Sequence, residues 1–219
     1  MSDFRSIAMV TAALQQFIQT AVNEVLSHAK VTVGPPSDKQ SETKPEVNLY
    51  LYNLSTNAEL RNHDLPRWGA DGALWRQPQA AINLHYLIAF AGAGVEPELM
   101  MGKVVGAFHG LPQINRARLA GLAQGSATIP PGAALLKDAD LDGQHDTIAI
   151  TPAYLDFEET AKLWSSFFQV RHRRSLMYEV HPLMIDAAKA AALPEVDPDV
   201  QSGPHLHHNA HVPVLGPGT

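Results

Sequence analysis

The fold is decided by residues 47–54, which read VNLYLYNL. Val47, Leu49 and Leu51 alternate with two tyrosines, and in a β-strand such alternation places the two sets on opposite faces. Strands that face water on one side carry bulky apolar residues on the other side only, whereas this stretch carries bulk on both. We therefore expect 47–54 to be a central strand with both faces covered.

The elements on either side of this strand follow from the spacing of apolar residues. Steps of three and four residues predict a helix, alternation predicts a strand, and Gly or Pro ends an element. Pro182 falls inside the last strand and implies an edge position or a bulge. On these signals we predict helices over 6–29, 97–111 and 156–168, and strands over 47–54, 81–90, 147–151 and 175–185.

The order helix, strand, strand, helix, strand, helix, strand predicts an α+β fold, with a mostly antiparallel sheet packed with helices. Residues 55–78 are expected to form a long irregular contact loop, and 121–132 a connection rich in Gly, Ala and Pro. From residue 194 onward the chain holds five of its 16 prolines and four of its 11 histidines. We therefore expect one domain over 1–186 and an extended Pro/His-rich C-terminal tail over 187–219.

Composition narrows the classes of function. A hydrophobic share of 45% fits a globular protein, and a charged share of 17%, below the usual ~25%, favours apolar contacts with other chains. The net charge of -6 argues against nucleic acid as the main partner. There are no cysteines, so disulfides and thiolate metal sites are excluded. Since neither a secretory signal nor a long apolar span is visible, we expect a protein of the cytoplasm without a membrane partner.

Three motifs could carry chemistry, and each has a plainer explanation. Gly92-Ala93-Gly94 follows a strand and opens a helix, but Pro97 takes the third glycine position of a dinucleotide loop, so a structural turn is favoured. Residues 138–143 match the first half of a calcium loop, but Ala149 stands where the bidentate Glu is needed, which favours an acidic turn. The histidines of 205–211 lie in the tail without preorganised partners. We expect no catalytic site, no metal and no cofactor.

Two regions are predicted to make assembly contacts. The first is the 55–78 loop, where Arg61, Asp64, Trp68 and Trp75 combine charges with large aromatic side chains. The second is the basic run Arg171-His172-Arg173-Arg174. This run is either a solvated turn or a charged contact with an acidic partner or nucleic acid.

Three groups of segments, taken in order, resemble one known family. They are 46–53 with Asn57 and 61–66, then 82–90, and then 163–169 followed by 171–180. Over about residues 5–186 the chain resembles the cap, or tail-terminator, proteins of extracellular contractile injection systems. These systems are phage-tail-like particles of the virulence-cassette and antifeeding-prophage type.

The resemblance implies a structural role. Such proteins form a sixfold ring on the distal end of the inner tube and sheath, where they stop polymerisation and tie the tube to the sheath. It implies copies of the chain itself, sheath protein and inner-tube protein as partners, with assembly in the cytoplasm and no catalysis. Two alternatives stay open: a baseplate or adaptor module of the same kind of particle, and a metal-dependent hydrolase that uses the acids of 138–146.

Overall fold

The computed structural model describes residues 5–37, 44–60, 67–68, 74–76, 79–125, 147–167 and 169–186. The helices are α1 (Ser6–Asn23), α2 (Glu96–Gly110), α3 (Arg116–Gly125) and α5 (Phe157–Ser165). The strands of the main sheet are β1 (Lys30–Val33), β2 (Glu46–Thr56), β5 (Gln79–Ala91), β6 (Gln113–Ile114), β7 (Ile148–Pro152) and β8 (Arg174–Asp186). Two short strands, β3 (Arg67–Trp68) and β4 (Leu74–Arg76), pair with each other.

The main sheet has six strands in the order β1-β2-β5-β8-β7-β6. Only β1 and β2 run parallel, and every other pair in this sheet is antiparallel. The predicted α+β fold with a mostly antiparallel sheet is therefore confirmed. The strand predicted as central, β2, lies between β1 and β5, as its bulk on both faces requires.

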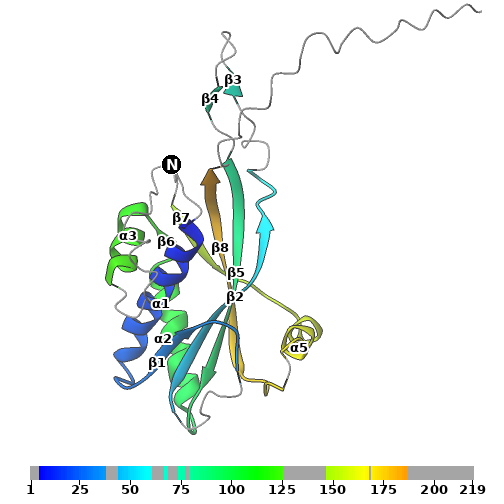
Figure 1. Cartoon of the computed structure of the whole chain (residues 1–219). Helices are drawn as coiled ribbons and strands as arrows, with labels where there is room; N and C mark the ends of the chain where they lie inside the picture. The colour runs from blue at the N-terminus through cyan, green and yellow to red at the C-terminus, as the bar shows by residue number, and fades with distance from the viewer. Residues whose placement is uncertain are drawn as a thin grey trace, which may run out of the picture. The chain divides into compact units, whose positions relative to one another are not determined.

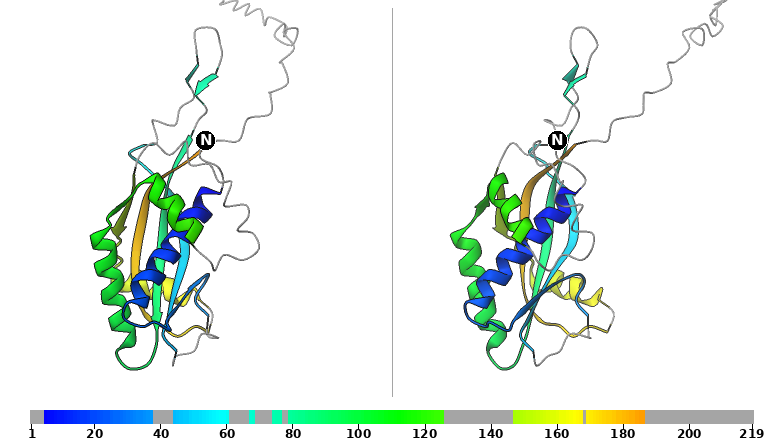
Figure 2. Two further views of the ribbon diagram at one scale, coloured as in Figure 1. Left: turned by 90° about the vertical axis from the view of Figure 1, so that its left-hand side faces the viewer. Right: turned by 60° about the vertical axis from the view of Figure 1, so that its left-hand side comes forward.

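One face of the sheet is covered by α1, α2 and α3, and α5 is the described helix that lies on the other face (Figure 1). The first face holds the larger core, because the alternating strands and the apolar stripes of the helices meet there. Phe108 of α2 lies at its centre, with its ring 5.6 Å from that of Phe17 and 4.6 Å from that of Tyr178. Other members of this core are Val10, Leu14, Ile18, Leu49, Leu84, Tyr86, Ile88, Met100, Val104 and Val180. The turned views show α1 crossing the strands (Figure 2).

The second face holds a smaller core under α5. Leu87, Ala89 and Met177 point to this side from β5 and β8, and Trp164 of α5 packs on them. The tyrosines of β2 join this cluster, and the Tyr50 ring meets Phe167 edge-on at 5.6 Å. The alternation that the sequence shows in 47–54 thus serves two separate cores.

The first helix is shorter than predicted. It ends at Asn23 instead of residue 29, because Lys30–Val33 forms β1 and pairs in parallel with β2. A strand of four residues so close to the end of a helix is too short to show an alternating pattern of its own in the sequence.

The helix α3 was also missed, and it takes up part of the 121–132 connection. Its start is fixed by Asn115, whose side-chain oxygen accepts a hydrogen bond from the Arg118 N–H at 2.9 Å.

Two further predictions concern the strands. The 55–78 stretch is not irregular throughout, since β2 continues to Thr56 and the β3–β4 hairpin forms within it. Pro182 lies in β8, which has β5 on one side and β7 on the other, and the pairing with β7 reaches only to His181. The bulge alternative is right: the pairing of β5 with β8 shifts between Ile82 and Leu84, next to the cis His181–Pro182 bond.

Candidate assembly surfaces

The predicted basic run lines a cavity of about 630 Å³, which we call the basic hollow. Its walls are the turn at residues 91–94 and the run 171–174. The turn follows β5 and the run precedes β8, so the pairing of Phe90 with Arg174 brings the two walls together. The hollow is therefore a direct product of the sheet register.

The glycine turn on one wall has a structural explanation. Gly92 and Gly94 have φ angles of 157° and 56°, which side chains rarely allow. A Cβ at Gly92 would also lie 2.9 Å from Oε2 of Glu96. That same carboxylate oxygen accepts a hydrogen bond from the Ala93 N–H at 2.9 Å. The turn thus needs glycine to enter α2, as the sequence indicated.

The basic run is tied to three other parts of the fold. Arg174 forms an ion pair with Glu98 of α2 at 2.5 Å. The guanidinium of Arg173 donates a hydrogen bond to the carbonyl of Ser37 at 3.3 Å, and the His172 ring lies 5.1 Å from Trp164 of α5. Arg171, His172 and Arg174 are nevertheless exposed. The run is an ordered rim, and its proposed contact with a partner stays a prediction.

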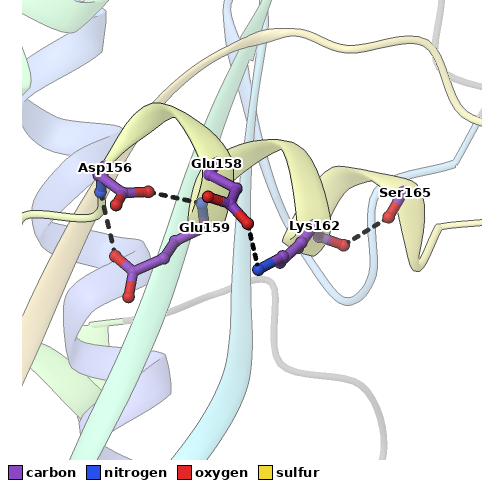
Figure 3. Close-up of polar contacts among 5 residues, drawn as sticks. All are labelled: Asp156, Glu158, Glu159, Lys162 and Ser165. Carbon is purple, nitrogen blue, oxygen red and sulfur yellow. Dashed lines mark hydrogen bonds and ion pairs between the residues drawn. The ribbon is translucent and has the colours of Figure 1, made fainter.

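A second surface, which the sequence did not single out, lies where the chain enters α5. The side chains of Tyr154 and Phe157 are 90% and 88% exposed. Asp156 stands between them as the N-cap of α5 and accepts from the Glu159 N–H at 2.7 Å, while Glu159 accepts from the Asp156 N–H at 3.1 Å (Figure 3). The capping box fixes where α5 starts, but no local signal in the sequence shows that these two aromatic side chains are exposed.

Glu158 adds to the acidic character of the same helical turn. It forms an exposed ion pair with Lys162 at 2.6 Å, one turn further along α5 (Figure 3). We call Tyr154, Asp156, Phe157, Glu158 and Glu159 the acidic knob. Large aromatic side chains that are exposed are typical of protein interaction sites.

A shallow groove of about 390 Å³ lies between α1 and α2. Phe17 and Ala21 of α1 form one side, and Gly102, Gly106 and Gly110 form the other. A Cβ built on any of these three glycines meets nothing within 4 Å. The groove therefore exists because side chains are missing, and no packing inside the described chain requires the glycines.

Two of the other predicted contact residues, Trp68 and Trp75, lie before the opposite end of β5 in the chain. Trp68 and Trp75 belong to the β3–β4 hairpin, which precedes β5, whereas the basic hollow follows it. Since β5 has 13 residues, it separates the two regions by about 40 Å. Arg61 and Asp64 lie outside the described residues, as do the acidic turn 138–143 and the histidines of 205–211.

Within the described ranges there is no group of three or more His, Asp or Glu that could hold a metal ion. Among the helices that the structure describes, none is long and apolar enough to cross a membrane.

The solved structures that resemble this chain include two from contractile particles. One is the PVC sheath/tube terminator of an extracellular contractile injection system in its extended state, with a TM-score of 0.55 and 18% identity, covering 87% of this chain. The other is the tube-terminating cap of the anti-feeding prophage, with a TM-score of 0.49 and 17% identity, covering 80% of this chain. This chain spans only 61% and 53% of their lengths. No curated protein matches.

The likeness to the PVC terminator shows a shared fold. The family match shows more than a shared fold. It extends over residues 9–197 and so includes both cores, the basic hollow and the acidic knob. The family match and the shared fold confirm the resemblance to cap proteins that the sequence segments indicated. The chain belongs to the family described as the Pvc16 N-terminal domain.

Proposed function

We propose that this protein is the terminator cap of a phage-tail-like contractile injection particle. Six copies form a ring on the distal end of the inner tube and sheath, end their polymerisation and tie the tube to the sheath. The observation that carries the proposal is the fold shared with a sheath/tube terminator over 87% of this chain. The family match over 9–197 supports it from the sequence side.

The surface of the protein suits this role. A growing tube or sheath ends in unsatisfied apolar and hydrogen-bonding groups, so a terminator must match that end on one side only. The chain offers an exposed aromatic pair, a basic hollow and a glycine-lined groove. Contacts between two different patches close into a ring when the rotation between copies allows it.

The proposed activity is docking, and it requires no bond to be made or broken. Its partners are copies of the same chain, the sheath protein and the inner-tube protein, met in the cytoplasm before the particle is released. We assign the ring to a domain over 1–186 and give the tail over 187–219, with the 55–78 loop, a role in contacts between neighbours. Removal of 194–219 is then expected to weaken ring formation or sheath binding, and unchanged rings and sheath binding would refute the role of the tail.

Particles produced with and without this protein test the proposal. Without it, we expect tubes and sheaths of widely varying length with open ends, because nothing stops subunit addition. Supplying the protein from a plasmid should restore a narrow length distribution. Normal lengths and closed ends in its absence would refute the cap function, and particles that fail to form a baseplate would favour the adaptor alternative.

A further inference from the structure

We propose that the acidic knob of one subunit inserts into the basic hollow of the next. This inference rests on the proposed function, since it names the surface through which the cap subunits join. The occupant of the hollow is a second copy of this chain.

The knob is a preformed shape. Its two aromatic side chains are about nine-tenths exposed, at 90% for Tyr154 and 88% for Phe157. The capping box between Asp156 and Glu159 fixes the backbone at the start of α5, where Phe157 is the first helical residue (Figure 3). Aromatic side chains have few rotatable bonds and lose little conformational entropy when they are buried, which is why they anchor interfaces.

The hollow complements the knob in size and in charge. Its volume of about 630 Å³ lies within the range of about 300–1,000 Å³ that accommodates sizeable ligands, and its glycine turn is a wall without bulky side chains. Arg171, Arg173 and Arg174 stand on its other wall, where Arg174 is paired with Glu98, and their charge is opposite in sign to that of the three carboxylates of the knob. Opposite charges around an apolar contact fix its register and exclude other partners.

A subunit cannot place its own knob in its own hollow. Trp164, near the end of α5, lies against His172 on the rim of the hollow. Phe157 is at the start of the same rigid helix, so the helix itself holds it about 10 Å away from the rim. Within the part of the chain that the structure describes, the knob is therefore held away from its own hollow and is open to another molecule. Because knob and hollow are different patches, the contact is head-to-tail, the type from which rings are built.

Nucleic acid is the other anionic class that could meet the arginines. It would leave the two exposed aromatics of α5 unused and would face the repulsion of the three carboxylates beside them. The overall charge of -6 also disfavours it. A second copy of the chain uses both surfaces at once.

Cysteine cross-linking tests the contact directly, because the natural chain contains no cysteine. A Glu158→Cys chain and an Ala93→Cys chain, carrying different tags, are mixed and treated with a short thiol cross-linker, both in solution and after assembly on particles. Both substituted side chains are exposed in the described fold. We expect a dimer bearing both tags, at a yield at least about tenfold above that of the control, and a ladder up to the full ring from the doubly substituted chain.

The matched control is His28→Cys, at an exposed turn after α1, mixed with either partner. If the Glu158→Cys and Ala93→Cys mixture cross-links no better than this control while the chain still caps particles, the inference is overturned and the cap function stands. If the chain neither associates with itself nor reaches the particle end, both are overturned.

A complementation experiment gives an independent readout. Tyr154→Ser with Phe157→Ser removes the knob at two exposed positions, and Ala93→Trp fills the hollow from an exposed loop. Each variant alone is expected to form no ring. Mixed together, they retain one intact knob and one intact hollow, so we expect pairs in a 1:1 ratio that do not grow. Rings from either variant alone would contradict the proposal.

Discussion

A single side chain, Tyr86, links the packing of the core to pH. It is fully buried on β5, and its hydroxyl lies 2.8 Å from Oγ1 of Thr11 on α1. Burial raises the pKa of Tyr86 well above its ordinary value, although the hydrogen bond with Thr11 acts in the opposite direction. Burial also raises the pKa of Tyr52 and of Tyr178, and for Tyr52 the Glu179 and Glu159 carboxylates add to the effect.

These shifts predict that stability is lost in alkali. Below pH 10 the tyrosines are protonated in both the folded and the unfolded chain. As pH rises above about 10, the unfolded chain releases its phenolic protons while the folded chain keeps them, so the free energy of unfolding falls. Tyr86→Phe should reduce this fall, and at pH 7 it should cost about 1 kcal/mol through the lost hydrogen bond. Urea unfolding at pH 7 and pH 10.5 measures both effects, and an unchanged alkaline loss in the variant would contradict the assignment.

Two glycines of similar sequence context should respond to alanine with opposite signs. Gly106 lies within α2, where an added Cβ meets nothing within 4 Å, so Gly106→Ala should stabilise the protein by about 0.5–1 kcal/mol. Gly92 has a φ of 157° and a Cβ there would press on the Glu96 carboxylate. Gly92→Ala should therefore destabilise by about 1–3 kcal/mol. Chemical denaturation of the pair is the measurement, and changes of the same sign would show that this reading of the backbone is wrong.

Among the elements, α5 depends on its cap more than on its ion pair. Asp156 bonds the Glu159 N–H at 2.7 Å, and Asp156→Ala should cost about 1 kcal/mol. The Glu158–Lys162 pair has side chains 75% and 71% exposed, so Glu158→Ala should cost no more than about 0.5 kcal/mol. Thermal unfolding compares the two variants, with Asp156→Ser as the variant that keeps a capping side chain. Equal losses for Asp156→Ala and Asp156→Ser would mean that the cap does not hold α5.

The edge strand β1 is covered by glutamine side chains of α1. Gln19 accepts a hydrogen bond from the Val31 N–H at 2.9 Å, and Gln15 donates to the Val31 carbonyl at 3.0 Å. These groups face away from β2, so the glutamines satisfy the backbone that a further strand would otherwise use.

Removal of this cover should make the protein both less stable and more prone to association. Gln19→Leu leaves the Val31 N–H buried without its partner, which should cost about 1–3 kcal/mol. Gln16→Leu, which leaves both Val31 contacts in place, is the matched control. Unfolding curves together with light scattering measure the two effects. If both variants behave alike, the glutamines do not protect the edge.

The elements that the sequence predicted well are those that carry their own signal. The strands β2, β5 and β8 alternate over many residues, and α1, α2 and α5 have apolar stripes with clear starts. The strand β1 has four residues and depends on partners in α1 and β2. In α3 the described apolar anchors are only Leu119 and Leu122. Such elements are determined by tertiary contacts, which no local pattern of residues reveals.

For the whole molecule, the candidate surfaces were predicted only in part. The basic run was visible because four basic or titratable residues stand together. Its hollow was not, because it depends on the register that sets Phe90 against Arg174. The acidic knob was missed because Tyr154 and Phe157 look like core residues in a sequence, and only the described fold shows that their side chains are exposed.

The central claim is that this chain docks onto copies of itself and onto the tip of a filament. Subunit-resolved electron microscopy of intact particles, with the chain carrying a bulky fusion as a marker, tests it most directly. The account predicts a single closed ring of six marked copies at the end opposite the baseplate, in contact with both the last tube ring and the last sheath ring. Marked density at the baseplate, along the length of the sheath, or at neither end would contradict it.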